Sequence, residues 1–413
     1  MTAEPRVSRA TSRIFSMLRP AGQKLPRDIK VMLAAAFLIA LGFGLVAPVL
    51  PQFATTFGVG NTEASVIVAI FAFMRLVFAP AGGALIGRLG ERPVYVAGLL
   101  IVAASTAACA FAQDYWQLLL FRGLGGAGSV MFTVASMALV VRLAPPESRG
   151  RVSGAYASAF LVGNVCGPIV GGLLAGFGLR VPFLAYAAAL VVAAVVVQTQ
   201  LSHQRRGSGE KQDRAPDMPL REALGMGTYR TALMSSFVNG WATFGVRMAT
   251  VPLFAVAALG SGPEAAGFAL AVFAAGNAAA LTFSGRLADS LGRKPMMVAG
   301  LLVAGASTAA IGFTSGLGWF LAASALAGVG SGLFGPALQA SVADVIGNER
   351  SGGKVLAVYQ MTSDVGAIVG PVLAGLLADR LGYGWAFGVT GGIMVVAAAG
   401  WLAARETLRT ARP

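Results

Sequence analysis

Long stretches without any charged residue constrain this chain more than any other feature. Residues 295–343 hold no Asp, Glu, Lys or Arg over 49 positions, and only 12% of the whole chain is charged. A soluble domain carries about 25%, and one membrane-crossing helix needs about 20 apolar residues. We therefore predict an all-α integral membrane protein with about twelve transmembrane helices. They are expected over 29–53, 63–86, 93–112, 115–141, 150–177, 180–199, 228–258, 264–288, 294–315, 317–343, 353–379 and 383–404.

The positions of the basic residues predict how these helices are oriented. The chain has 31 Lys and Arg and a formal net charge of +14. If the N-terminus is inside, 26 of them fall in cytoplasmic segments and only Arg180 and Arg380 fall in outside loops. This positive-inside pattern predicts cytoplasmic termini, and the excess of Arg over Lys is typical of GC-rich bacteria, so we expect a bacterial plasma membrane. The basic balance thus indicates topology and contact with anionic lipids, and we expect no nucleic-acid partner.

The second half of the chain repeats the first at an offset of about 202 residues. GALIGRLGERP (83–93) corresponds to GRLADSLGRKP (285–295), and GNVCGPIVGGLLA (163–175) corresponds to GAIVGPVLAGLLA (366–378). Internal repeats of this kind are common in secondary transporters. We predict a cytoplasmic basic arm, a six-helix bundle, a cytoplasmic linker, a second six-helix bundle and a cytoplasmic tail. Their bounds are 1–28, 29–199, 200–227, 228–404 and 405–413.

One glycine pattern raises the question of a nucleotide cofactor. FRGLGGAGSVMF (121–132) has the spacing G-x-G-x-x-G, but an apolar helix surrounds it, with no preceding strand and no acid about twenty residues later. Small residues in membrane helices let neighbouring backbones approach closely, so we interpret these glycines as packing positions. The chain has no phosphate-binding loop of the G-x-x-x-x-G-K-[ST] type and no metal-ligand spacing among its two Cys and one His. We expect no cofactor, no metal and no enzymatic activity.

Several motifs resemble those of the major facilitator superfamily, most of all its twelve-helix drug/proton antiporter branch. The first helix has GFGLVAPVLPQF (42–53), and the loop after the second has G-x-x-x-G-R-x-G-E-R-P, with Gly87 where the family usually has Asp. The fourth helix carries Arg122 followed by glycines, with Gly125 in place of the usual Gln. The fifth helix has the exporter-type motif G-x-x-x-G-P-x-x-G-G at Gly163, Gly167, Pro168, Gly171 and Gly172. The resemblance covers nearly the whole chain.

The resemblance implies two pseudo-symmetric six-helix bundles around a central cavity. Helices 1, 4, 7 and 10 would line this cavity, while helix 2 would meet helix 11, and helix 5 would meet helix 8, between the halves. An ionisable side chain inside the bilayer is costly and therefore functional by default. Four qualify, and we expect them to serve proton coupling or the substrate cavity: Arg75, Arg122, Arg247 and Asp364.

Two of these charges are expected to form a pair. Arg75 and Asp364 each lie about a dozen residues into helices that would touch, at similar depth. A buried Arg–Asp pair there would break when the halves separate and could be released by a proton. The alternative is a static salt bridge. For Arg122 the alternative is packing against backbone carbonyls, and for Arg247 it is snorkelling to the outer interface.

Polar and aromatic side chains supply candidates for the cavity wall. Asn239, Thr243 and Arg247 share a helix face at spacing i, i+4, i+8, and so do Ser331, Gly335 and Gln339. Gln360 shares a face with Asp364 in the same way. Hydrogen bonding between helices is the alternative for these stripes. An apolar wall could be supplied by further residues, although each could be core or lipid contact: Phe43, Met131, Phe132, Trp241 and Phe334.

Loop motifs and prolines supply the candidates for gating. Asp289 is expected to meet the start of helix 5 at Arg149 and Arg151, where the helix dipole also favours an acid. Pro168 and Pro371 occupy equivalent positions near the interface between the halves and could act as bending points or static kinks. The remaining candidates belong to the two loop motifs: Gly83, Gly90, Arg92, Arg293 and Lys294.

These observations lead to one expected function and two alternatives. We expect a proton-coupled secondary transporter that exports small amphipathic molecules, either drug-like compounds or a native metabolite or lipid, by alternating access. An uptake symporter for a sugar or organic anion would share the fold, and an integral-membrane enzyme or receptor is a more distant alternative. The expected partners are the substrate, protons and membrane lipids, with the chain acting as a monomer.

Overall fold

The computed structural model describes residues 26–143, 149–201, 218–347, 350 and 352–407, with only the backbone described for a few helical residues such as Arg149 and Arg151. Within these ranges the chain is helical and contains no strand. Twelve helical spans are long and apolar enough to cross a membrane, so the predicted all-α, twelve-helix class is confirmed.

Six spans make up each half. In the first half they are α2 with α3, then α4 to α8: Arg27–Val46, Leu50–Thr55, Asn61–Leu89, Glu91–Ala110, Tyr115–Leu143, Arg149–Ala175 and Val181–Gln200. In the second half, the short α9 precedes the divided span α10–η2–α11, and α12 to α16 follow. Their bounds are Leu220–Gly225, Gly227–Asn239, Gly240–Val246, Arg247–Ala257, Pro263–Leu291, Arg293–Ile311, Leu317–Ile346, Gly353–Leu381 and Tyr383–Ala403.

The first span is interrupted between α2 and α3, next to Pro48 and Pro51. Proline lacks a backbone N–H and cannot continue the hydrogen-bond ladder of a helix. The side-chain amide of Gln52 donates to the carbonyl oxygen of Pro48 at 3.0 Å and so satisfies one of the carbonyls at this break. The seventh span is interrupted differently, by the π-helical segment η2.

Glycine contacts hold the helices of each half together. Gly128 of α6 lies against Gly98 of α5, where an added Cβ would stand 3.0 Å from the Gly98 carbonyl oxygen. The equivalent contact in the second half joins Gly330 of α14 to α13, with an added Cβ 2.4 Å from the backbone nitrogen of Ala304. The G-x-G-x-x-G segment of α6 therefore contributes to helix packing, as the sequence predicts, because Gly126 likewise abuts the backbone of Phe71.

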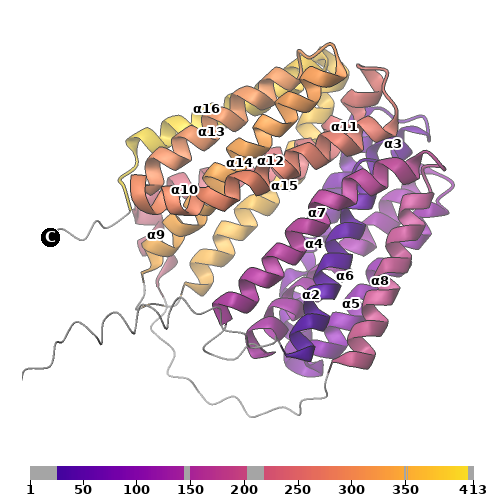
Figure 1. Ribbon diagram of the computed structural model, residues 1–413, viewed down its shortest axis with the longest axis horizontal. Helices are drawn as coiled ribbons and strands as arrows, with labels where there is room; N and C mark the ends of the chain where they lie inside the picture. The colour runs from indigo at the N-terminus through magenta and orange to yellow at the C-terminus, as the bar shows by residue number, and fades with distance from the viewer. Residues whose placement is uncertain (1–25, 144–148, 202–217, 348–349, 351, 408–413) are drawn as a thin grey trace, which may run out of the picture.

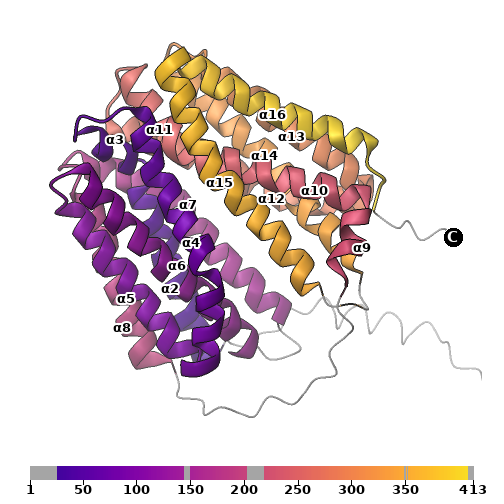
Figure 2. The same cartoon turned by 180° about the vertical axis from the view of Figure 1, so that it is seen from behind.

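The two halves form a V (Figures 1 and 2). They meet at the end that bears α3 and α11, which we call the far end. They diverge toward the end where α8 finishes and α10 begins, which we call the linker end. Leu253 of α11 belongs to the apolar core of the first half, and Ala47 belongs to a core cluster of the second half.

Two pairs of antiparallel helices form the seams between the halves: α4 with α15, and α7 with α12. At the first seam, Gly375 lies against the start of α4. A Cβ added to Gly375 would stand 2.8 Å from the Asn61 carbonyl oxygen. At the second seam, a Cβ added to Gly267 would stand 2.4 Å from the Pro168 carbonyl oxygen and 3.0 Å from the Gly172 Cα. Both sets of contacts lie at the far end. The pairing is the one that the family resemblance implies.

The substitution Gly167→Val tests how much the first half depends on such contacts. A Cβ on Gly167 would lie 2.5 Å from the Leu41 carbonyl oxygen and 2.7 Å from the Gly44 Cα, so α7 would be forced away from α2. We expect a loss of about 1–3 kcal/mol in stability, as for other overpacked sites. Thermal unfolding of the purified protein measures it. Gly388→Val on α16, where nothing lies within 4 Å, is the matched control. Equal melting of the two variants would contradict the packing role.

Candidate functional site

Arg122 of α6 is buried inside the first half. Its side chain is 7% exposed, and its guanidinium carbon lies 4.1 Å from the ring centroid of Phe71 on α4. Gly126, one turn further along α6, lets α4 come close enough for this stacking. A guanidinium over an aromatic face gains cation–π attraction. Its Nε has no hydrogen-bond partner, and no carboxylate pairs with it, among the described residues.

Arg247 of α11 repeats this arrangement in the second half. It is 6% exposed, and its guanidinium carbon lies 3.0 Å from the ring centroid of Phe273 on α12. Phe71 and Phe273 are 202 residues apart, so they are equivalent positions of the internal repeat. One Nη of Arg247 lacks a hydrogen-bond partner within the described part of the chain. Each half thus buries one arginine on the same repeated phenylalanine, although the two arginines come from non-equivalent helices.

The π-helical segment η2 changes the predicted stripe on the seventh span. A π-helix has a wider turn than an α-helix, so Arg247, which directly follows η2, does not continue the face of Asn239 and Thr243. Those two side chains are half-buried and hydrogen-bonded to each other at 3.1 Å, whereas Arg247 is buried. Trp241, within η2, is also buried and donates from Nε1 to the Thr390 hydroxyl at 3.1 Å.

The expected ion pair between Arg75 and Asp364 is not formed in this conformation. Arg75 donates from a guanidinium nitrogen to the Ser129 hydroxyl at 2.7 Å, and Asp364 accepts from the Gln360 amide at 3.3 Å. Both charged side chains are half-buried. Their charges still interact electrostatically across the α4–α15 seam, and the Tyr186 hydroxyl lies within electrostatic range of Arg75 and Arg122. The residues are therefore brought near each other without contact.

The candidate cavity residues divide into a buried and an accessible group. Phe132 and Phe334, also 202 residues apart, fill the cores of the two halves beneath Gly98 and Gly300, so their rings do not line a cavity. Phe334 is fully buried. The accessible group comprises the half-buried Phe43, Met131 and Gly335 and the exposed Gln339 and Gln360; Ser331 is buried.

The second loop motif forms a charged cluster within its own half. Asp289 forms an ion pair with Arg293, which also lies 3.5 Å from Asp344. The Glu406 carboxylate accepts from the backbone nitrogens of Arg293 and Lys294 at 3.0 Å each. The expected contact of Asp289 with Arg149 and Arg151 falls on side chains outside the described residues.

The other gating candidates lie near helix contacts. Gly163 and Gly171 pack against the backbone of α2, as Gly167 does, and Pro371 packs against Gly245 of η2. Gly90 ends α4 with φ +89°, a conformation that favours glycine. Gly83 lies on α4, and its surroundings are outside the description.

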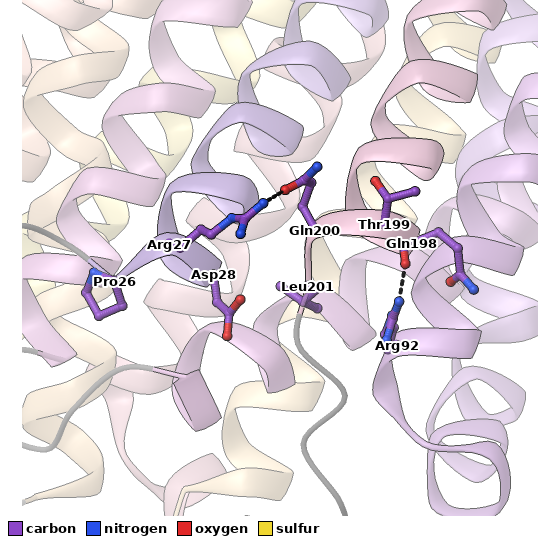
Figure 3. A pocket seen from close by; sticks show the side chains of 8 residues that line it. All are labelled: Pro26, Arg27, Asp28, Arg92, Gln198, Thr199, Gln200 and Leu201. Carbon is purple, nitrogen blue, oxygen red and sulfur yellow. Dashed lines mark hydrogen bonds between the residues drawn. The ribbon is translucent and has the colours of Figure 1, made fainter.

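A surface pocket of about 700 Å³ lies at the linker end of the first half (Figure 3). Within it, Arg27 donates to the Gln200 side chain and Arg92 donates to the Gln198 carbonyl oxygen. The pocket is formed by the starts of α2 and α5 and the end of α8, and none of the four intramembrane charges lines it. No group of three or more metal-ligating side chains occurs in the described ranges.

Sequence reasoning missed one acid at the α4–α15 seam. Asp379, near the end of α15, accepts four hydrogen bonds from the first two residues of α4. The donors are the backbone and side-chain nitrogens of Asn61, at 3.0 and 2.7 Å, and the backbone nitrogen and hydroxyl of Thr62, at 2.8 and 2.6 Å. The sequence carries a signal for it within the second half: GLLADRLG (375–382) resembles GRLADSLG (285–292), the motif around Asp289.

Known proteins of similar sequence include proteins named for drug resistance. Multidrug resistance protein 2 of Bacillus subtilis (strain 168) is 27% identical over 89% of this chain and 92% of its own length. The class C tetracycline resistance protein of Escherichia coli is 30% identical over 87% of this chain and 92% of its own length.

Solved structures with the same fold include transporters. A bacterial homologue of the human lysosomal transporter Spinster, in an inward-facing and unoccupied conformation, superposes with a TM-score of 0.80 at 19% identity, covering 92% of this chain and 97% of that one. A POT family transporter in complex with a thioalcohol-conjugated peptide gives 0.76 at 12% identity, covering 91% and 95%. At these identities the likeness concerns the fold alone.

The family match extends over nearly the whole described chain. The family model of the Major Facilitator Superfamily matches residues 32–248 and, in a second overlapping match, residues 232–413. Together with twelve membrane spans and two repeated six-helix halves, this match shows that the chain belongs to the Major Facilitator Superfamily, where it is most like the drug/proton antiporters, and that it is a secondary transporter.

Proposed function

We propose that this transporter exports small amphipathic molecules in exchange for protons, by rocking its two halves about the seams between them. The observation that carries the proposal is the uneven contact between the halves. Both seams are packed through glycines at the far end, while the bundles diverge toward the linker end. Contact between the halves at one end and divergence at the other is the arrangement that alternating access requires.

The basic residues orient this path. Segments at the linker end carry most of the Lys and Arg, so the positive-inside rule places that end in the cytoplasm of a bacterium and the far end outside. The conformation described would then be open toward the cytoplasm. All twelve spans and both seams belong to one chain, which supports a monomer embedded in membrane lipid as the working unit.

Proton coupling is assigned to Arg75 and Asp364, with Arg122 nearby. In the described conformation the two charges make separate hydrogen bonds, to Ser129 and Gln360. Closing the linker end would bring α4 and α15 together along their full length and allow the direct ion pair. Protonation of Asp364 removes its charge, weakens that pair and favours the separated state described here.

The charge balance inside the membrane bears on the substrate. Three intramembrane arginines stand against one central acid, and neither Arg122 nor Arg247 has a carboxylate partner among the described residues. Relatives named for resistance to multiple drugs and to tetracycline support an amphipathic drug-like substrate. The excess positive charge favours a neutral or anionic molecule over a cation. It also keeps one alternative open, the uptake of an organic anion.

The linker end is proposed to close through Asp289. This acid ends α12 opposite the start of α7, where backbone N–H groups and the nearby Arg149 would attract it. In the described conformation it is paired with Arg293 of its own half, which leaves the linker end free to open.

Transport by the Arg122→Ala variant tests the central assignment. Purified protein in liposomes, loaded with a pH-sensitive dye under an imposed proton gradient, would receive lipophilic cations, neutral antibiotics, organic anions and lysolipids in turn. We expect one class of compound to trigger proton flux through the wild type. The flux through the variant should be lower by about tenfold or more, because the substitution removes a buried charged donor. Arg230→Ala, an exposed arginine on α10, is the matched control. Wild-type flux in Arg122→Ala would exclude the coupling role.

The Asp364→Asn variant tests the proton site separately. Asparagine has the size of aspartate and keeps the hydrogen bond to Gln360. Its amide cannot bind or release a proton over the pH range of the assay. We expect the pH dependence of substrate efflux to flatten while binding persists. Efflux rates measured from acidic to alkaline pH would be compared with those of Asp114→Asn, an exposed acid at the start of α6. An unchanged pH profile would leave Asp364 with a structural role only.

Cysteine accessibility tests the location of the substrate path. In a Cys109→Ala, Cys166→Ala background, Gln339→Cys and Gln360→Cys should react with a charged thiol reagent supplied from the linker side, because both positions are exposed on polar helix faces. Phe334→Cys should remain unreactive, because that position is fully buried in the core. Protection of the two glutamine positions would show that they face lipid, and the proposed path would have to be moved.

A further inference from the structure

The start of α4 lacks a cap of its own. The first N–H groups of a helix have no partner within the helix and are usually capped by the side chain of a preceding Ser, Thr, Asp or Asn. Here the N-cap residue is Gly60, which has no side chain. Glu63 bonds back to the Gly60 nitrogen at 3.1 Å, but the nitrogens of Asn61 and Thr62 remain to be satisfied.

Asp379 supplies this cap from the opposite half. Each of its two carboxylate oxygens accepts two hydrogen bonds, one from a backbone donor and one from a side-chain donor. The donors to Oδ1 belong to Asn61 and those to Oδ2 belong to Thr62. A carboxylate at a helix N-terminus is also favoured by the helix dipole. The helix being capped and the residue capping it lie 317 positions apart in the chain.

Neighbouring contacts tie this cap to the closed position of the far end. The Tyr383 hydroxyl, at the start of α16, donates to the Asn61 side-chain oxygen at 2.8 Å, so Asn61 is held by two residues of the second half. Gly375, one turn before Asp379, lies against the Asn61 carbonyl and the Thr62 Cα, where an added Cβ would stand at 2.8 and 2.9 Å. These contacts require the end of α15 and the start of α16 to rest on the start of α4.

We propose that Asp379 is the latch of the far end: it holds the transporter closed there by capping α4 across the seam, and it must let go each time the far end opens. The inference rests on the proposed rocking of the halves and adds the residue that biases it. Opening breaks all four hydrogen bonds of Asp379 and leaves the two backbone N–H groups of α4 without their cap, and this loss favours the closed state.

A motif that occurs twice within the second half supports a dedicated role for this acid. The motif G-x-L-A-D-x-L-G occurs at 285–292 and at 375–382, and it ends α12 at the linker end and α15 at the far end. Asp289 and Asp379 therefore occupy the same motif position at opposite ends of the molecule, each on the second-half helix of one seam. In this conformation the acid of the closed end bonds to the other half, whereas the acid of the open end pairs within its own half.

The test measures both ends of the purified full-length chain by distances between spin labels. In the Cys109→Ala, Cys166→Ala background, one label pair replaces Gln113 and Ser315, exposed at the far ends of opposite halves. A second pair replaces Leu89 and Leu291 at the linker end. We expect Asp379→Asn to lengthen the far-end distance and shorten the linker-end distance, with the far-open population rising about tenfold, the usual effect of losing a charged hydrogen bond.

Two further variants make the result specific. Thr62→Val keeps the shape of the side chain and the backbone donor but removes the hydroxyl, so it should shift both distances in the same directions by less. It also tests the latch if Asp379→Asn does not fold. Arg380→Gln changes the exposed neighbour of Asp379 and should leave both distances as in the wild type.

The outcomes separate the latch from the transport cycle. If the wild type exchanges between the two states at acidic and alkaline pH, and neither Asp379→Asn nor Thr62→Val shifts the populations, the latch is excluded while alternating access stands. If the wild type holds one pair of distances under every condition, alternating access fails and the latch fails with it. If Arg380→Gln opened the far end as much as Asp379→Asn does, the latch would also be overturned. The opening would then follow from any loss of charge at the end of α15 and not from the loss of the cap.

Discussion

Apolar side chains gain nothing by leaving lipid for another helix, so the helices of this protein must be held by close packing of their backbones. Glycine supplies that closeness throughout. Gly128 and Gly330 join neighbouring helices at equivalent places in the two halves, and Gly126 brings α4 near enough to α6 for Phe71 to lie beneath Arg122. The position of Arg122 over Phe71 therefore depends on a residue that has no side chain.

The sequence predicts the helices because their signals run along the chain, whereas the pairing of helices between the halves was implied by the family resemblance. Charge-free stretches give the spans, and the repeat gives the two halves. Helix rotation is harder, since a span that is apolar on every side does not reveal which side faces a neighbour. Phe132 and Phe334 show the difficulty: both suit a cavity wall by composition, and both lie in a core. The π-helical segment before Arg247 left no sequence signal that an α-helical spacing could detect.

Electrostatic partners are harder still, because they depend on the conformation as well as the fold. Depth along the helices brings Arg75 and Asp364 to one seam, but the same residues bond to Ser129 and Gln360 while the bundles diverge. Asp379 shows the opposite case. Its neighbours in sequence indicate an ordinary surface acid after a membrane helix, and only the fold places it on the start of α4. The sequence shows the motif around Asp379, but it does not indicate that Asp379 bonds to the start of α4.

The two seams differ in what they are made of. At the α7–α12 seam, Gly267 and Gly172 bring the two backbones close together, with Gly267 against the Pro168 carbonyl oxygen. Smooth surfaces of this kind can remain in contact while their tilt changes. The α4–α15 seam has a similar glycine contact at Gly375 and, in addition, the directional hydrogen bonds of Asp379. In the proposed cycle the α7–α12 seam would act as the pivot and the α4–α15 seam as the latch. Substitutions at the latch would then change the rate of turnover without changing a residue that contacts the substrate.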